Sequence, residues 1–411
     1  MKYLKRIIAF MLCLIIVLTG IGADSVSACL KTHYNNLNIP LCSLFVQNLV
    51  EDNESITDIN EIDLAQEESS EDIQEEQVRK VEALMKKMTW KEKVAQMILV
   101  SAPGDASDVQ KNYQFGGYIL FAGDFEKATP ASIKRRIKGI QSASKIPMLI
   151  AVDEEGGTVV RVSKYKQFRS KTYDSPQSVY AAGKWSGIIK DTKSKAKFLK
   201  NLGINTNLAP VADVAYKKSD FIYKRSFSTN AKSTSKYIKK VVNTMKEKNL
   251  ISTLKHFPGY GNNGDTHTQL IHDYRSKKSF EKRDLKPFQA GIDAGCDMIM
   301  VSHNIVHCFD PKNPASISPK VISYLRNDMG FEGVIVTDSL TMNGVIKHTG
   351  SEGESAVRAV KAGNDLLCTS EYKKTYKALI KAVKNKEISK ERIDESVRRI
   401  LFMKYERGII V

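Results

Sequence analysis

The chain has 411 residues and a formal net charge of +17, because 63 lysines and arginines stand against 46 aspartates and glutamates. Its six cysteines are widely scattered and form no CxxC pair, which excludes a zinc ribbon and argues against a disulfide framework. A chain this basic is drawn to polyanions, and its segments indicate which ones.

Residues 1–28 have the layout of an export signal. A basic start, MKYLKR, precedes an apolar run over 7–18 that is short for a membrane span. Cleavage after Ala28 would release the mature protein, but VSAC at 26–29 also resembles the lipobox of bacterial lipoproteins, with Cys29 as the lipidated residue. We therefore expect an exported protein, extracellular or attached to the cell surface, and leave lipid anchoring at Cys29 open.

Residues 29–77 are predicted to form an acidic, disordered linker. The part from 51 to 77 holds twelve acidic residues and no basic ones, and it is too poor in apolar residues to form a core. The remainder of the chain is correspondingly more basic. For an exported protein, the polyanions that such a body meets are anionic cell-wall polymers or lipid surfaces, so we expect no nucleic-acid partner.

The segment 78–411 alternates short apolar runs with amphipathic stretches such as 131–143, 231–248, 281–294 and 371–384. Eight β-branched runs that alternate with helices predict a parallel sheet, and eight strands close a (β/α)₈ TIM-type barrel, an α/β fold. An open doubly wound sheet is the alternative, but no GxGxxG follows the first run. The eight runs are VAQMILVS, GGYILFAG, PMLIAVDEEGG, INTNLAPVADV, LISTLKHFPG, DMIMVSHN, GVIVTDSL and NDLLCTS.

Polar residues gather at the carboxyl ends of these runs, the edge that carries active sites in such barrels. The richest example is KHFPGYGNNGDTH at 255–267, because a surface turn needs glycines but not two histidines, a lysine and an aspartate together. A final helix is expected over 388–408, with no second domain after it. The other polar strand ends are at Asp153, Asp213, His303 and Asp338.

Six motifs occur in the order, and on the strands, expected of one family: AVDEEGGTVVR, NLAPVADV, KRSFS, KHFPGYGNNGDTH, MVSHN and GVIVTDSLTM. On these motifs the chain resembles glycoside hydrolase family 3 from about residue 80 to 407, and specifically its β-N-acetylglucosaminidase (β-hexosaminidase) branch. Six ordered motifs are far more specific than any single one. The resemblance implies a glycosidase that uses no cofactor and no metal ion.

In the enzymes that this chain resembles, the aspartate at the position of Asp338 is the nucleophile that forms a covalent glycosyl-enzyme. Attack by this carboxylate and then by water gives two inversions, so we expect retained stereochemistry. The alternative role for Asp338 is an N-cap of the helix that follows. His303, at the end of the preceding run, is expected to line the site without doing chemistry.

The same resemblance assigns the proton donor to His267, paired with Asp265 on a glycine-rich loop after the fifth strand. A neighbouring carboxylate fixes the tautomer of an imidazole and raises its pKa, which suits an acid that later acts as a base. The chain departs from the common pattern in two ways: Tyr260 stands where a histidine is usual, and there is one residue fewer between Pro258 and the Asp-x-His. The shorter loop bears on reach and specificity rather than on the chemistry of the dyad.

The sugar-binding residues also follow from the resemblance. Asp153 matches an aspartate that accepts hydrogen bonds from sugar hydroxyls, and Arg161 and Arg225 match arginines that line the sugar subsite. Lys255 and His256 match the pair that contacts the sugar beside the nucleophile. The structural alternative is an Asp153–Arg161 ion pair, a satisfied core histidine at 256 and a surface charge at Lys255.

The sequence therefore predicts a retaining exo-β-N-acetylglucosaminidase that removes terminal N-acetylglucosamine from peptidoglycan fragments or short amino-sugar oligomers. One alternative is another family 3 exo-glycosidase such as a β-glucosidase, although such relatives usually take their acid/base from a second domain. Another is a metal-dependent barrel hydrolase that uses His256, Asp265 and His267. The third is a catalytically dead barrel that binds cell walls.

Overall fold

Parallel strands joined by helices make up the described part of the chain. The computed structural model describes residues 75–266 and 268–410. The predicted signal peptide, and the predicted linker up to residue 74, lie outside the described residues. A helix covers 75–87 and precedes the first helix and strand of the barrel.

Eight of the described strands form one parallel sheet, in the order β10-β1-β2-β3-β4-β5-β7-β9. A bridge between Val336 and Leu366 joins the two ends of this order and nearly closes the ring. Each predicted apolar run supplies one strand, so the predicted (β/α)₈ barrel is confirmed. The strands are β1 (Ile98–Ser101), β2 (Gly117–Leu120), β3 (Leu149–Val152), β4 (Thr206–Asn207), β5 (Ile251–Phe257), β7 (Met298–Val301), β9 (Val334–Thr337) and β10 (Leu367–Thr369).

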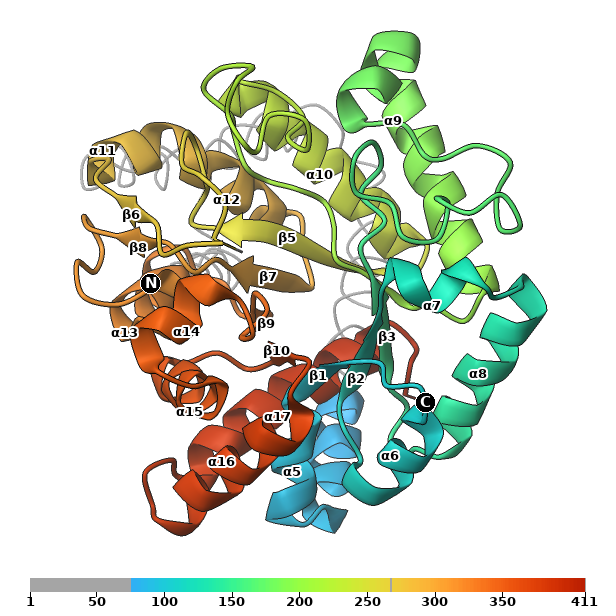
Figure 1. Ribbon diagram of the computed structural model, residues 1–411, viewed down its shortest axis with the longest axis vertical. Helices are drawn as coiled ribbons and strands as arrows, with labels where there is room; N and C mark the ends of the chain where they lie inside the picture. The colour runs from blue at the N-terminus through green and yellow to red at the C-terminus, as the bar shows by residue number, and fades with distance from the viewer. Residues whose placement is uncertain (1–74, 267, 411) are drawn as a thin grey trace, which may run out of the picture. The chain divides into compact units, whose positions relative to one another are not determined.

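The barrel strands have continuous apolar runs because they are buried on both faces. Every residue of β2, β3, β5, β7, β9 and β10 is buried. Figure 1 shows that helices form an outer ring around the strands. The buried side chains of the strands belong to one hydrophobic core. Cys296 and Cys368 are free thiols in this core.

Strand β4 is much shorter than the predicted run over 204–214. Pro210 has no N–H to give to a strand ladder, and the Ala209 amide instead bonds to the carbonyl of Asn207. Parallel pairing resumes as a single bridge between Val211 and Lys255. The chain after β4 therefore stays against β5 and brings Asp213 beside the residues at the end of that strand.

Side-chain caps set where several connecting helices begin. Thr129 accepts from the Ser132 amide at the start of α8 (Pro130–Ser142), which also has proline in its first turn. Asn230, Ser351 and Ser389 cap α10 (Ala231–Glu247), α15 (Glu352–Ala362) and α17 (Lys390–Glu406) in the same way.

The predicted helical stretches are confirmed. Residues 131–143, 231–248, 371–384 and 388–408 correspond to α8, α10, α16 (Tyr372–Lys384) and α17, whereas 281–294 is shared by a π-helical turn, η1 (Phe280–Asp284), and α12 (Leu285–Asp293). None of the helices in the described ranges is both long and apolar enough to span a bilayer. The other main elements are α5 (Trp90–Gln96), α6 (Ala106–Tyr113), α7 (Ala122–Glu126), α9 (Pro176–Asn201), α11 (Lys277–Ser279), α13 (Pro319–Ser323), α14 (Asn343–Thr349), and the short strands β6 (His272–Asp273) and β8 (Ile305–Val306).

Candidate active site

The carboxyl ends of β3 and β5 bring a lysine and two acids together. Lys255, near the end of β5, lies 2.7 Å from Asp153 Oδ1 and 2.6 Å from Glu155 Oε1. Its side chain is 3% exposed, so the alternative of a surface charge is wrong. Burial alone would lower the pKa of Lys255, but the charges of Asp153 and Glu155 outweigh burial and raise it. The ammonium is therefore a fixed cation in the site.

Glu155 is the central acid of this cluster. It faces Lys255 on one side and the Arg225 guanidinium on the other, with Arg225 Nε 3.0 Å from Oε2 and Nη2 2.7 Å from Oε1. Burial would raise the pKa of Glu155, but the two cations lower it well below its usual range. Such a bidentate pair fixes the plane of the guanidinium, so Glu155 orients Arg225.

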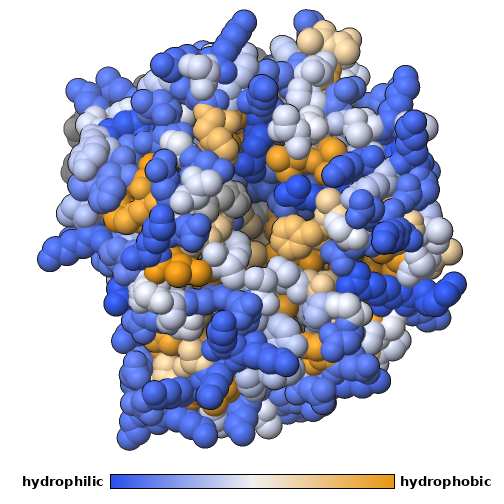
Figure 2. All heavy atoms as spheres, viewed as in Figure 1, coloured by the Kyte–Doolittle hydropathy of each residue, from blue (hydrophilic) through white to orange (hydrophobic). Residues whose placement is uncertain are grey.

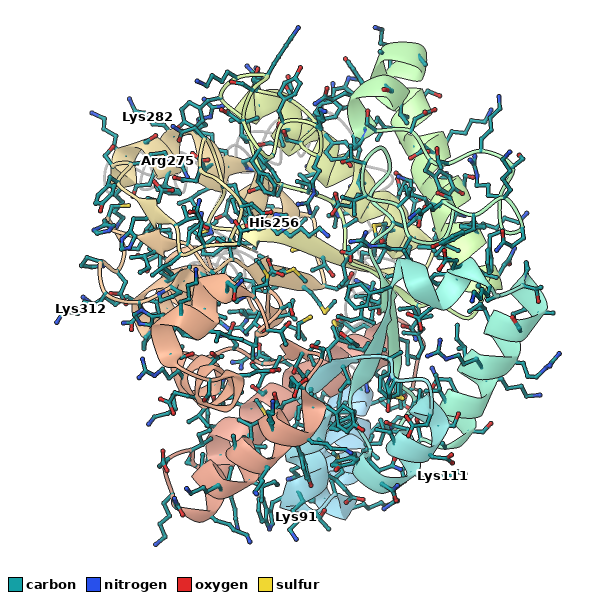
Figure 3. All side chains as sticks on the ribbon, in the orientation of Figure 1. Lys91, Lys111, His256, Arg275, Lys282 and Lys312 are labelled. Carbon is teal, nitrogen blue, oxygen red and sulfur yellow. The ribbon has the colours of Figure 1, made fainter. Side chains whose placement is uncertain are left out.

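His256 has both ring nitrogens engaged. Nδ1 lies 2.7 Å from Asp213 Oδ2, and Nε2 lies 3.1 Å from Arg225 Nη2. A guanidinium can only donate, so Nε2 accepts from Arg225, and Nδ1 carries the proton and donates it in a hydrogen bond to Asp213. This arrangement fixes the tautomer, and it disfavours a metal ion on Nε2 because Arg225 already places a cation there. Figure 3 shows His256 near the middle of the barrel, whereas Lys91, Lys111, Lys282 and Lys312 lie at the periphery of the molecule.

The backbone after β3 is organised by Glu154 and Gly156. The Glu154 carboxylate accepts from the amides of Arg161 and Val162, both at 2.9 Å, so it holds the returning strand of the loop. Gly156 has φ +100°, and a Cβ there would lie 2.3 Å from the Asp174 carbonyl oxygen. Arg161 itself is part-exposed and lies 3.7 Å from Asp153 Oδ2, at the rim of the cluster.

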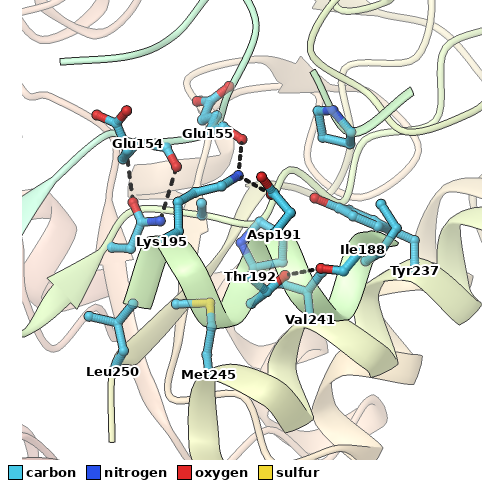
Figure 4. Close-up of a pocket in the computed structure, with 14 residues that line it drawn as sticks. Glu154, Glu155, Ile188, Asp191, Thr192, Lys195, Tyr237, Val241, Met245 and Leu250 are labelled. Atoms are coloured by element: carbon cyan, nitrogen blue, oxygen red, sulfur yellow. Dashed lines mark hydrogen bonds and ion pairs between the residues drawn. The ribbon is translucent and has the colours of Figure 1, made fainter. Parts of the chain in front are cut away.

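A small cavity of about 20 Å³ lies behind this loop, between α9 and α10. Figure 4 shows how Lys195 of α9 bridges it: its Nζ donates to the Glu155 carbonyl at 3.0 Å and pairs with Asp191 at 2.9 Å. The cavity has room for about one water molecule. Lys195 supports the loop after β3 from behind, and the cavity is too small to be a substrate site.

Asp338 follows the last residue of β9, Thr337, as predicted. Its amide donates to the Val301 carbonyl at 3.0 Å, and its Oδ1 accepts from the Ser339 amide at 2.8 Å. The alternative of a helix N-cap is wrong, because the residue that precedes α14 is Met342. Burial raises the pKa of the Cys368 thiol, and the charges of Asp338 and Asp153 raise it further. Asp338 thus lies at the carboxyl-end face of the barrel, the face that also carries Asp153 after β3.

His303 supports the chain beside Asp338. Its Nε2 lies 2.9 Å from the Ser339 carbonyl oxygen, which can only accept, so Nε2 carries the proton and Nδ1 accepts from the Ser316 hydroxyl at 2.7 Å. The buried ring fixes the residue next to the predicted nucleophile. His303 thus has a structural place beside Asp338, and its lack of a chemical role stays a prediction.

The loop after β5 carries the predicted acid/base pair. Asp265 is half-buried, and its carbonyl accepts from the Thr268 hydroxyl at 3.2 Å. His267 lies outside the described residues, so its pairing with Asp265 stays a prediction. Within the described ranges, no three His, Cys, Asp or Glu side chains lie close enough to hold a metal ion together. Figure 2 shows apolar side chains around the middle of this face and mostly hydrophilic ones toward its edge.

Comparison with known proteins agrees with this geometry. Residues 89–403 match the family described as the glycosyl hydrolase family 3 N terminal domain. The chain belongs to this family. It is therefore a glycoside hydrolase by descent, and the predicted family resemblance is confirmed.

Three relatives of this family 3 chain are informative. A β-hexosaminidase of Nitrosomonas eutropha is 31% identical over 262 residues, which cover 61% of this chain and 72% of the relative. β-Hexosaminidase A of Pseudoalteromonas piscicida is 29% identical over 337 residues, covering 74% of this chain and 56% of the relative. The structure of a family 3 β-N-acetylglucosaminidase from a Paenibacillus species matches with a TM-score of 0.73 and 31% identity, covering 78% of this chain and 63% of that one. The chain thus spans less than two thirds of the last two proteins.

Two acids of the family 3 site escaped the sequence analysis as site residues. Glu155 joins Lys255 to Arg225, and Asp213 holds His256. A signal for Glu155 was present, because three consecutive acids rarely follow a buried strand unless cations meet them. Asp213 was recognised as a polar strand end. Its partner, His256, could not be predicted from sequence spacing, because the contact depends on the path of the chain after the short strand β4.

Proposed function

We propose that the protein is an exported, retaining exo-β-N-acetylglucosaminidase that removes terminal N-acetylglucosamine from peptidoglycan fragments or amino-sugar oligomers. The observation that carries the proposal is that Asp338 follows β9 at the carboxyl-end face of the barrel, the face that also carries the cage of fixed charges formed by Asp153, Glu155, Lys255 and Arg225, in a chain that belongs to glycoside hydrolase family 3. The names of its β-hexosaminidase relatives support the choice of sugar.

The cage suits recognition of sugar hydroxyls. Asp153 and Glu155 accept hydrogen bonds, whereas Lys255, Arg161 and Arg225 donate them, and charged partners make such bonds strong and directional. The ion pairs within the cage hold each side chain in place before a sugar arrives. Little reorganisation is then needed when the sugar binds, which favours the transition state.

In the proposed mechanism, His267 gives its proton to the glycosidic oxygen while an Asp338 oxygen attacks the anomeric carbon. The bond to the leaving group breaks, and a covalent glycosyl-enzyme forms with inverted configuration. Water then attacks that carbon, His267 takes the proton from the water, and Asp338 leaves as the carboxylate. The second inversion restores the original configuration. Asp265 orients the imidazole through both steps.

The substrate source and the location of the enzyme rest on the sequence. The predicted export signal and the basic composition of the body support action outside the cytoplasm, near anionic wall polymers. Peptidoglycan fragments supply N-acetylglucosamine at such a place. Lipid attachment at Cys29 is the proposed route by which the protein would stay at the membrane.

The experiment that tests the proposal compares an aryl β-N-acetylglucosaminide with the matching aryl β-glucoside, using purified protein. We expect a kcat/KM at least about tenfold higher for the N-acetylglucosaminide, because selectivity for an acetamido group rests on a few directed contacts. Preference for the glucoside would favour the β-glucosidase alternative. Binding of cell walls without hydrolysis of either sugar would favour a dead barrel.

A further inference from the structure

Tyr260 connects the end of β5 with the loop that carries Asp265. Its amide donates to Asp213 Oδ1 at 2.7 Å, while Asp213 Oδ2 accepts from the amide and the ring of His256. The Tyr260 ring meets the His256 ring edge to face, with 5.0 Å between centroids. The backbone and the ring of Tyr260 are therefore both fixed relative to His256.

The hydroxyl of Tyr260 reaches the catalytic loop. Its oxygen lies 2.5 Å from Thr266 Oγ1, and both residues are essentially inaccessible, at 1% and 0% exposed. Burial, and then the charge of Asp338, raise the pKa of Tyr260, so the phenol keeps its proton and the two hydroxyls share a neutral hydrogen bond. Because water does not reach this bond, losing it leaves a buried polar group with no replacement partner.

Thr266 is also held from the other side of the site. Its carbonyl accepts from the Gly344 amide at 3.1 Å, in the first turn of α14. A Cβ at Gly344 would lie 2.7 Å from that carbonyl oxygen, so the close approach needs glycine. Helix α14 follows Asp338 after a short loop. Thr266 is thus clamped between Tyr260, which is tied to His256, and the segment that follows Asp338.

We propose that Tyr260 is a positioning residue for the acid/base loop: through its hydroxyl bond to Thr266, it sets where the segment that includes Asp265 stands relative to Asp338. This inference rests on the proposed function, in which that segment delivers the proton. Removing the hydroxyl keeps the ring packed against Val211 and Ile222 but releases one side of the clamp. The catalytic group would then be misplaced without loss of the fold.

The test is Tyr260→Phe, which deletes one oxygen. We expect its kcat/KM to fall about 10- to 100-fold for an aryl glycoside with a poor leaving group, because a small misplacement of a catalytic group costs up to about that much. For a dinitrophenyl glycoside the fall should be under about threefold, since that group departs with little protonic help. Thr266→Val should act similarly, and the double variant should be no worse than the more damaged single one.

Tyr216→Phe is the matched control, because it removes a tyrosine hydroxyl bonded to a serine, Ser279 at 3.1 Å, outside the site. It should change neither substrate. Equal slowing of both leaving groups by Tyr260→Phe, or additive losses in the double variant, would overturn the proposal. The aryl glycosides carry whichever sugar the wild-type enzyme hydrolyses. A wild-type preference for another sugar would therefore count against the proposed function without deciding the role of Tyr260.

Hydrogen exchange supplies a readout that needs no activity. Tyr260→Phe should speed exchange in the peptide over 259–271 and at the Gly344 amide, and Tyr216→Phe should not. Unchanged exchange at both places would overturn the proposal, even if the protein hydrolysed no tested sugar.

Discussion

The ion-pair cage makes a prediction about Glu155 and Lys255. Glu155→Gln keeps the shape of the side chain but removes the negative charge that pairs with the buried cations of Lys255 and Arg225. Removing one partner of a buried ion pair costs about 3–5 kcal/mol, so the free energy of unfolding should fall by that amount. Lys255→Met should cost a similar amount, because Glu155 and Asp153 then lose a shared cation 2.6 and 2.7 Å away.

The double variant separates stability from function. Glu155→Gln with Lys255→Met removes one charge of each sign, so its loss should be smaller than the sum of the single losses by about 2–3 kcal/mol. Activity should not return with stability, because Lys255 is proposed to contact the sugar. Urea unfolding followed by circular dichroism gives the free energies, and aryl glycoside hydrolysis gives kcat/KM.

A surface pair serves as the control for this cycle. Arg358 and Glu354 lie 2.7 Å apart on α15 but are 42% and 46% exposed, so Glu354→Gln and Arg358→Met should show a coupling below about 1 kcal/mol. Strictly additive losses at Glu155 and Lys255 would mean that the two charges do not stabilise each other and would contradict this prediction.

The remaining predictions concern the proton donor, the linker and a buried lysine. His267→Ala should slow substrates with poor leaving groups most and should be rescued by a small anion that forms a glycosyl adduct of retained configuration, with Asp265→Ala milder; equal slowing without rescue would make His267 a binding residue. Deleting 51–74 should leave hydrolysis of a small soluble substrate and the melting temperature almost unchanged. Burial lowers the pKa of Lys404 to about 7, so the folded protein loses stability as the pH falls from about 10.5 to 7, where this lysine is protonated in the unfolded chain but still neutral in the folded one. Lys404→Met should therefore gain about 4 kcal/mol more stability at pH 6 than at pH 10 in urea unfolding, and a pH-independent difference would contradict this.

The sequence predicts the barrel well because each strand is a short apolar run that ends in a polar residue. The sequence could not show that β4 is short, since the effect of Pro210 depends on whether a neighbouring strand would accept a hydrogen bond from an N–H at that position. It also left two roles open for Lys255, because a lysine at a strand end is buried only if acids converge on it from other strands. That convergence, of Asp153 and Glu155, is a property of the closed sheet.

The role of Tyr260 illustrates the same limit. In the sequence it is a departure from the family pattern, in a loop one residue shorter than usual. Its contact with Thr266 depends on the fold of that loop, and the second contact, from Gly344 to Thr266, comes from a residue 78 positions farther along the chain. No local sequence pattern predicts these contacts, because they join the segment that follows β5 to the segment that follows β9.

The central claim is that Asp338 is the nucleophile of a retaining N-acetylglucosaminidase. The most direct measurement treats the enzyme with a fluorinated N-acetylglucosaminide that has an activated leaving group, so that the covalent intermediate forms faster than it is hydrolysed, and locates the label by peptide mass spectrometry. We expect one sugar per chain, attached to the Asp338 carboxylate and absent from Asp338→Ala. A label on another carboxylate, or turnover of the natural linkage with inverted configuration and no covalent adduct, would contradict it.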